Sequence, residues 1–223
     1  LSSVLDIKMK EGNKNKFSGA GGIGLIASRL TLEGPIQKGK SSFIVSGRRT
    51  YFDLITRQIN KANEGKKDYN PIPDYYFYDL NIKANYEISP KDRLFVSGYF
   101  GRDVFKFAGT GGNFNFDFDW GNTTATARWN HVFSPKLFLN TTLIYSDYQY
   151  KIRNRFSSFI FNIGSAVKDY NFKTDFDYLH SEKHHIRFGS QLTHHKFDVA
   201  RIRFASDDNR VNFNSGNGFE GTE

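Results

Sequence analysis

The segment from Gly34 to Ser41 fits the pattern G-x-x-x-x-G-K-S, in which a loop holds phosphate groups. That chemistry needs backbone amides at the start of a helix and a lysine that reaches the phosphates. Pro35 removes one of these amides, because proline has no N–H group. The residues after Ser41 favour a strand, so the segment is interpreted as a basic turn between two strands.

Two pairs of histidines raise the question of a metal site: His184 with His185, and His194 with His195. Nine or ten residues along one strand span about 30 Å, so the two pairs cannot share one ion unless the chain folds back. Adjacent side chains of a strand also point to opposite faces. The sequence therefore predicts solvated or interfacial histidines and no metal site.

Acidic and aromatic residues are mixed in two segments, Phe114–Trp120 and Asp207–Glu223. Such mixtures suit sugars, siderophores or calcium, but neither segment has the EF-hand spacing. Both are interpreted as outer loops rich in Asn or Gly. The chain shows no nucleophile elbow, no paired metal ligands and no catalytic carboxylates. It is therefore predicted not to be an enzyme and to need no cofactor, and no ligand-binding residue is assigned.

The composition excludes several classes of protein. Aromatic residues make up 17% of the 223 residues, with 23 Phe and 12 Tyr, while only 38% are hydrophobic and the mean hydropathy is −0.56. The chain is too polar for a helical membrane protein and too aromatic for a disordered chain. Its net charge is +8, but the basic residues are scattered and no nucleic-acid-binding motif occurs. We expect no nucleic-acid partner.

Two segments alternate apolar and polar residues with a period of two, which predicts strands with one apolar face. From Tyr76 to Glu87, tyrosines stand at both ends of a face that also carries Leu80 and Ile82. From Asp169 to Leu179, aromatic residues alternate with charged or amide side chains. About eleven residues of this pattern match a tilted strand that crosses a bilayer with lipid on one side and a wet lumen on the other.

Short turns recur roughly every 45–55 residues, at Gly34–Gln37, Ser89–Asp92, Ser134–Lys136 and Ser181–Lys183. Longer connections are predicted between them, over residues 58–74, 108–117, 152–164 and 201–223. Short turns at one end and long loops at the other are typical of an up-and-down transmembrane β-barrel. The all-β pattern gives about nine antiparallel strands, and an amphipathic helix is predicted over Tyr51–Ala62. Closed bacterial barrels have an even number of strands, so about nine strands predict a partial barrel. An open sheet would leave unpaired edges in lipid, so further strands are expected to close it.

Three segments near the start resemble a known family, the TonB-dependent outer-membrane receptors. Residues 1–12 are similar to the end of the plug domain in that family, and residues 29–36 to its second barrel strand and first periplasmic turn. Residues 42–51 are similar to the third strand of Bacteroidetes-type receptors. Beyond residue 55 the resemblance lies only in the regular spacing of the short hairpin turns.

The resemblance implies a fragment of a 22-stranded barrel: residues 1–15 as the last plug strand and its linker, and residues 16–223 as the first part of the barrel. It implies a bacterial outer-membrane location and energised uptake of an iron chelate, cobalamin, glycan or peptide. The implied partners are outer-membrane lipid, the protein's own plug, a small nutrient ligand, and the TonB complex through a segment absent here. The alternative is a secreted β-sandwich that binds carbohydrate or acts as an adhesin.

Overall fold

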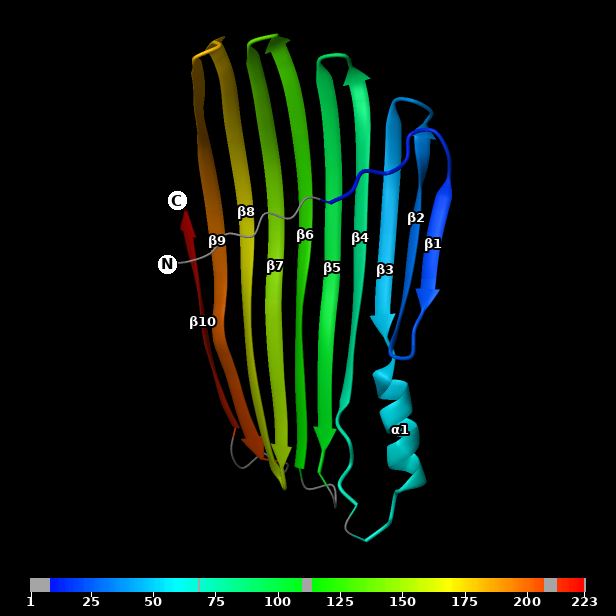
Figure 1. The fold of residues 1–223 in the computed structure, drawn as a ribbon. Helices are drawn as coiled ribbons and strands as arrows, with labels where there is room; N and C mark the ends of the chain where they lie inside the picture. The colour runs from blue at the N-terminus through cyan, green and yellow to red at the C-terminus, as the bar shows by residue number, and fades with distance from the viewer. Residues whose placement is uncertain (1–8, 68, 110–113, 207–211, 223) are drawn as a thin grey trace.

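A computed structural model describes residues 9–67, 69–109, 114–206 and 212–222. Ten strands follow one another in a single sheet, each antiparallel to its neighbours, in the order of the sequence (Figure 1). The elements are β1 (Ser18–Ile23), β2 (Ala27–Gln37), β3 (Ser41–Thr50), α1 (Phe52–Ala62), β4 (Asp74–Ser89), β5 (Asp92–Ala108), β6 (Phe114–Ser134), β7 (Leu137–Phe156), β8 (Phe159–Ser181), β9 (His184–Ser206) and β10 (Asn212–Thr222). The predicted all-β, up-and-down architecture is confirmed.

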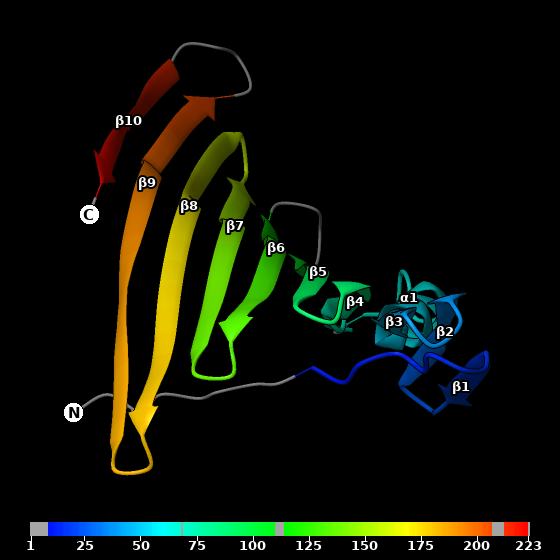
Figure 2. The same cartoon turned by 90° about the horizontal axis from the view of Figure 1, so that it is seen from above.

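The described strands form one curved, twisted layer without a second sheet packed against it (Figure 2). Only three hydrophobic residues are buried within the described chain: Val104, Leu139 and Ala205. A sandwich needs two sheets that enclose an apolar core, so the β-sandwich alternative is wrong. The described part contains no helix with the length and hydrophobicity needed to span a bilayer.

Several predicted loops are strands, so the described sheet has ten strands and not nine. β7 and β8 run through residues 152–164 and are joined by a two-residue turn, where Ser157 has a φ of 55°. β6 includes Phe114–Trp120, and β9 and β10 occupy most of residues 201–223. The Asn- and Gly-rich β10 has little intrinsic strand preference, and its pairing with β9 overrides that preference.

The short hairpin turns lie at one end of the sheet as predicted, but not every connection at the opposite end is long, because a two-residue turn joins β7 and β8. Short turns at residues 38–40, 90–91, 135–136 and 182–183 lie at one end of the sheet, and the helix and the other connections lie at the opposite end (Figure 1). At the second turn, Ser89 donates a hydrogen bond to Asp92 (2.7 Å) and accepts one from the Lys91 amide (3.1 Å). β2 extends through Gly34–Gln37 and β3 starts at Ser41, so no helix follows to receive a phosphate.

The predicted helix is confirmed as α1, which follows β3 at the loop end of the sheet. Two side chains tie it to the start of β4: Thr56 Oγ1 donates to Asp74 (2.6 Å), and Arg57 Nε donates to the same carboxylate (2.9 Å). This hydrogen bond raises the pKa of Arg57. Asp53 is fully buried, with its carboxylate 3.4 Å from both Arg49 and Arg57. These contacts tie the helix to β3 and β4 at the loop end of the sheet.

The strands are much longer than a bilayer crossing needs. β6 to β9 contain 20–23 residues each. At a rise of 3.3 Å per residue these strands reach roughly 65–75 Å, whereas 9–11 tilted residues suffice to cross the hydrocarbon. About half of each long strand must therefore extend beyond the bilayer. The polarity of the two faces of the sheet shows which half lies in the bilayer and which extends beyond it.

Candidate ligand-binding surface

The two faces of the sheet are distinguished by the N-terminal segment, residues 9–16, which lies against only one of them. We call this the inner face and the opposite one the outer face. Lys83 on β4 contacts Glu11 (2.5 Å) and the Met9 carbonyl (3.1 Å), and Asn85 donates to Glu11 (2.7 Å). Lys14 reaches Glu87 at 3.2 Å. The polar residues predicted to share one face of β4 thus hold this segment by ion pairs and hydrogen bonds.

Residues 1–8 lie outside the described residues, so the predicted plug strand is not described. From Met9 to Phe17 the chain forms no strand. The segment packs closely on β3: a Cβ added at Gly12 would lie 2.1 Å from the Phe43 carbonyl oxygen. Because that atom belongs to the backbone, only glycine allows this approach.

Near the turn end, the outer face is a band of exposed apolar side chains. Leu80 and Ile82 are each 47% exposed, and Leu143 on β7 is 54% exposed. The strand register places Leu143 between Ala127 and Phe172, so the band continues from β4 to β9. The predicted alternation is confirmed, with apolar residues on the outer face and Asn81, Lys83, Lys173 and Asp175 on the inner face.

Rows of aromatic side chains border this band on both sides. Towards the loops, Tyr145 packs on Tyr170 with ring centroids 5.2 Å apart, and Tyr170 on His194 at 6.4 Å. Towards the turns, Phe176 stacks on Phe188 at 5.0 Å. The nine residues from Tyr170 to Tyr178 on β8 include both rows and the next aromatic side chain towards the turns. This matches the 9–11 residues with which a tilted strand crosses the hydrocarbon of a bilayer.

Beyond the Tyr145–Tyr170 row the polarity of the outer face reverses, and charged residues follow the aromatic ones. On the next paired row, Lys168 lies 3.7 Å from Asp147, and Lys196 lies 2.7 Å from Glu220. Further charged residues cover the outer face up to the loops: Arg102, Lys106, Asp117, Asp119, Lys151, Arg153, Arg155, Asp198, Arg201 and Arg203. This half of the outer face suits water or polar groups rather than hydrocarbon.

Asp119 anchors the charged outer face. Its side chain is 6% exposed and pairs with both Arg102 and Arg153, the latter at 3.0 Å. Arg153 also reaches Asp117 at 3.9 Å. Because one nearly buried carboxylate is shared by guanidinium groups from β5 and β7, it joins three strands at this height.

The inner face of the same half is aromatic. Phe118 and Trp120 have ring centroids 4.5 Å apart, Phe118 and Tyr150 lie at 6.4 Å, and Phe159 stacks on Phe204 at 5.6 Å. Other members of this inner aromatic surface are Tyr75, Phe77, Phe105, Phe107, Phe114, Phe116, Tyr148, Phe156, Phe161, Phe197 and Phe219. Apolar rings that face inward at this height offer a surface on which a flat or apolar ligand can pack.

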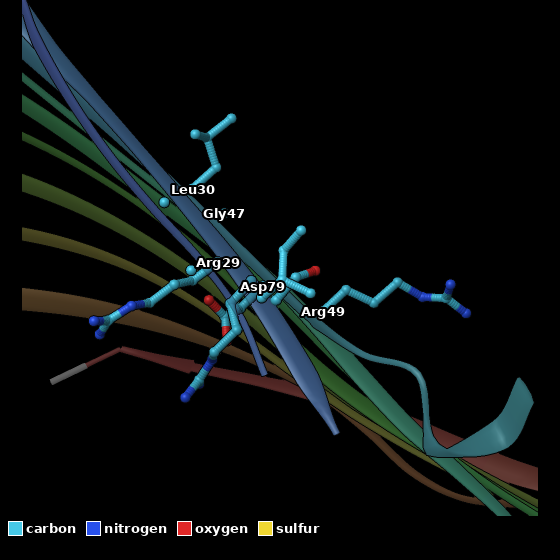
Figure 3. Close-up of a pocket in the computed structure, with 10 residues that line it drawn as sticks. Arg29, Leu30, Gly47, Arg49 and Asp79 are labelled. Atoms are coloured by element: carbon cyan, nitrogen blue, oxygen red, sulfur yellow. The ribbon is translucent and has the colours of Figure 1, made fainter. Parts of the chain in front are cut away.

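A pair of arginines lies at the β2–β3 side of this surface, level with its lowest rings. Arg29 and Arg48 are paired in register, and Arg48 is paired with Asp79 on β4. Arg48 donates to one Asp79 oxygen from Nε (2.9 Å) and Nη2 (2.6 Å), and its guanidinium lies 4.7 Å from the Phe77 ring. In Figure 3, Arg29 and Asp79 project to one side of the sheet, and Leu30 and Arg49 to the other.

A hollow of about 800 Å³ surrounds this arginine pair. Residues of both faces line it, because Gly21, Gly22 and Gly47 have no side chains to cover the backbone. It is an open depression at the edge of the sheet rather than an enclosed cavity. A second hollow of about 520 Å³ lies in the outer apolar band, above Ala125 and Ala127.

The histidines that suggested a metal site are separated by the sheet. His194 faces outward and accepts or donates a hydrogen bond at Thr222 (3.0 Å), while His195 faces inward towards Asp169 (2.7 Å). His184 and His185 start β9 at the turn end, where His185 contacts Asp177. Within the described residues, no three His, Cys, Asp or Glu side chains are grouped to hold a metal ion.

The segments that suggested ligand binding have different outcomes. Phe114–Trp120 belongs to β6 and contributes alternate residues to the inner aromatic surface and the charged outer face. In the second segment, residues 207–211 and 223 lie outside the described residues, and the remainder is β10. The described parts of both segments are strands rather than the expected loops. The sequence analysis did not find Arg29 and Arg48, which are 19 residues apart and meet only through the β2–β3 register.

No protein-family model matches the sequence, and no curated protein matches it. Among solved structures, the chain is similar to the crystal structure of the ferric yersiniabactin uptake receptor FyuA from Yersinia pestis. The TM-score is 0.57 at 11% sequence identity, over 88% of this chain and 34% of that one. The chain thus spans about a third of that receptor's length. At this identity the likeness shows the fold alone: a partial β-barrel like that of the receptor.

Proposed function

We propose that this chain forms wall and outer loops of an outer-membrane receptor that takes up a scarce nutrient ligand. One observation carries the proposal: the outer face is apolar from the Tyr145–Tyr170 row towards the turns, over about the length of strand that crosses a bilayer, and charged beyond that row. A protein surrounded by water has no reason to expose such a band, because large apolar patches promote association. The solved receptor of similar fold is an uptake receptor, which supports the same class of function.

The N-terminal segment supports the receptor assignment over a simple pore. A pore needs an open lumen, whereas residues 9–16 here cross the inner face and are held by Lys83, Asn85 and Glu87. We assign residues 1–15 to the end of a plug and its linker, as in the Bacteroidetes-type TonB-dependent receptors that the sequence resembles. Energised uptake through the TonB complex follows from that resemblance. The implied partners are outer-membrane lipid, the plug and a small ligand.

The inner aromatic surface is the proposed site of first contact with the ligand. It lies on the half of the strands that extends past the apolar band, on the side of α1 and the loops. A ligand arriving from outside the cell would meet these rings before it reached the N-terminal segment. This arrangement fits an iron chelate, cobalamin or glycan, each of which offers a flat or ring-shaped face.

Single cysteines in the intact protein test the proposed orientation. Ser158→Cys, in the exposed turn between β7 and β8, is expected to react with an impermeant maleimide on whole cells. Lys91→Cys, exposed in the turn between β4 and β5, is expected to react only after the outer membrane is permeabilised. Both positions are solvent-exposed, so chemical reactivity is matched and membrane sidedness decides the result.

Labelling of Lys91→Cys on intact cells, with Ser158→Cys protected, would reverse the orientation. Equal labelling of both cysteines without permeabilisation would show that no membrane separates them, and would contradict the proposed membrane location. Uptake of candidate ligands into cells that carry or lack the intact gene then tests transport, separately from orientation.

A further inference from the structure

We infer that the outer face of the sheet binds one anionic lipid at a defined site on β6 to β9. An acyl chain of the lipid lies in the hollow over Ala125 and Ala127, and its phosphate lies in a second hollow beside Lys151. The inference goes beyond uptake and rests only on the membrane location within the proposed function. Two hollows carry it, because they follow one another along the same strands.

The first hollow lies in the outer apolar band and has a volume of about 520 Å³. Its lining includes two small side chains, Ala125 and Ala127 on β6, and three large ones, Leu143, Phe172 and Leu192, on the next three strands. The large side chains project past the alanines and leave a depression between them. A hydrocarbon chain that fills this depression gains close contacts on several sides, which a flat surface would not provide.

The second hollow, of about 280 Å³, lies beyond the Tyr145–Tyr170 row on the same strands, β7 to β9. Each of these strands contributes one basic side chain to it: Lys151 from β7, Lys168 from β8 and Arg201 from β9. Basic side chains that converge from neighbouring strands suit a phosphate group, because both ammonium and guanidinium groups bind phosphate through charge-assisted hydrogen bonds.

Small residues form the middle of the second hollow. Gly164 on β8 is paired in register with Lys151 on one side and with Arg201 on the other. A Cβ added at Gly164 would lie 3.6 Å from Cγ of Lys151, so a side chain there would press against the lysine. The two basic residues are two strand spacings apart, roughly 10 Å, and their long side chains can close on one phosphate between them.

The charges that line the second hollow do not balance. Two carboxylates line it, and each has a basic partner: Asp147 lies 3.7 Å from Lys168, and Asp198 lies 2.7 Å from Arg201. Lys151 is exposed and makes no hydrogen bond or ion pair with the part of the chain that the structure describes. The hollow therefore has one positive charge in excess, which an anionic headgroup would neutralise.

The second hollow lies at the level of lipid headgroups. Lys151 is fifteen residues from the turn residue Lys136, and Tyr170 of the aromatic row is twelve residues from the turn residue Glu182. The difference of three residues is roughly 10 Å along a strand, and less in height because barrel strands are tilted. The headgroup layer on each side of the hydrocarbon is about 5–8 Å thick. A phosphate bound by Lys151 would lie in this layer.

Other occupants fit less well. A lipid without net charge could fill the apolar hollow but would leave the charge of Lys151 unbalanced. A free anion could bind Lys151 but would leave the apolar hollow unused. An anionic lipid fits both hollows at once, because its chain and its phosphate are joined in the direction in which the hollows follow each other.

The test uses native mass spectrometry of the intact protein in neutral detergent. Dioleoyl phosphatidic acid is the anionic probe, and dioleoyl phosphatidylcholine, which has the same chains and no net charge, is the reference. The wild type should bind its first phosphatidic acid more tightly than phosphatidylcholine. Lys151→Gln should weaken binding of phosphatidic acid about fivefold, the effect of one basic side chain near an anionic lipid. Lys151→Arg should retain the affinity, because it retains the charge.

Lys106→Gln is the matched control for the charge. Lys106 is an exposed lysine of the outer face on β5, fifteen residues from the turn residue Lys91, so it lies at the same height as Lys151. It does not line the second hollow. Its replacement removes the same charge from the same face and should leave binding unchanged.

Ala127→Phe tests the chain end of the site, since the ring would occupy the apolar hollow and should lower the bound fraction of phosphatidic acid. Ala84→Phe makes the same change on the outer face of β4, outside that hollow, and should not lower it. Inorganic phosphate should not displace the lipid at equal concentration, because it has no chain.

Equal affinity for the two lipids would overturn the inference, as would binding that Lys151→Gln leaves unchanged. Equal weakening by Lys106→Gln and Lys151→Gln would indicate attraction by net charge alone and would also contradict a defined site. Equal effects of Ala127→Phe and Ala84→Phe, or full displacement by inorganic phosphate, would contradict the placement of the chain.

This test is separable from that of the proposed function. If the cysteine labelling succeeds and Lys151→Gln has no effect on lipid binding, the lipid site alone is wrong. If the labelling shows the reverse orientation and Lys151→Gln still weakens binding, the lipid site stands in the opposite leaflet.

Discussion

Replacement of Leu143 by arginine is expected to lower the free energy of unfolding of the intact barrel in lipid vesicles by about 2–4 kcal/mol. Leu143 is 54% exposed and lies in the outer apolar band between Ala127 and Phe172. If this face met water, Leu143→Arg would be an ordinary surface change that costs less than about 0.5 kcal/mol. Denaturant titration of the vesicle-inserted protein, followed by tryptophan fluorescence, measures the difference.

Gln149→Arg is the matched control for this substitution. Gln149 lies on the same strand and the same face, six residues closer to the loops and beyond the Tyr145–Tyr170 row. There the outer face is charged, so the added arginine is expected to change stability by less than about 0.5 kcal/mol. Equal costs at Leu143 and Gln149 would contradict the boundary between the apolar band and the charged extension.

The second large effect concerns the isolated chain of residues 1–223, which is expected to aggregate in buffer without detergent. β1 and β10 each pair on one side only, so both edges of the described sheet expose unpaired backbone groups. The outer band adds a continuous apolar surface, and only three hydrophobic residues of the described chain are buried. Sedimentation and size-exclusion chromatography, with and without detergent, measure the soluble fraction.

The double substitution Leu143→Lys and Phe172→Lys places charge on the band and should raise the soluble fraction of this isolated chain. Asn81→Lys adds charge to the inner face and should raise it less. A monomeric 25.6 kDa species that unfolds cooperatively in plain buffer would contradict the membrane assignment.

The alternation in β4 was predictable because its two faces differ in chemistry over a whole bilayer crossing. Tyr78, Leu80 and Ile82 share the apolar face, and Asn81 and Lys83 the polar one, so a period of two is visible without neighbours. The helix α1 was predictable for a similar reason, since Leu54, Ile55 and Ile59 recur at helical spacing. Local periodicity was sufficient for these elements.

The extended half of the strands was not predictable from local pattern. In residues 152–164 the apolar side chains except Ile160 point inward, so the alternation has the opposite sense to that in the membrane band. The alternation within one segment identifies two faces but does not indicate which of them points inward. Only the register with neighbouring strands shows that Tyr150 and Phe118 share the inner face with Lys173 and Asn81.

The arginine pair was not predictable because it depends on register rather than on spacing. Arg29 lies in a short, half-polar strand and Arg48 near the end of the next, and neither forms a recognisable motif. The turn at residues 38–40 and the bulge between Pro35 and Gln37 decide that these two positions meet. A one-residue slip would move one arginine to the opposite face.

Depth-dependent quenching of single labelled cysteines tests the central claim most directly, namely that one face meets lipid over a limited height and the other does not. In the intact protein in vesicles, a fluorophore at Leu143→Cys should be quenched by nitroxide-labelled lipid and shielded from aqueous iodide. Fluorophores at Tyr148→Cys, on the inner face, and at Lys151→Cys, on the outer face beyond the aromatic row, should show the reverse. Iodide quenching at Leu143→Cys equal to that at Lys151→Cys would contradict the account.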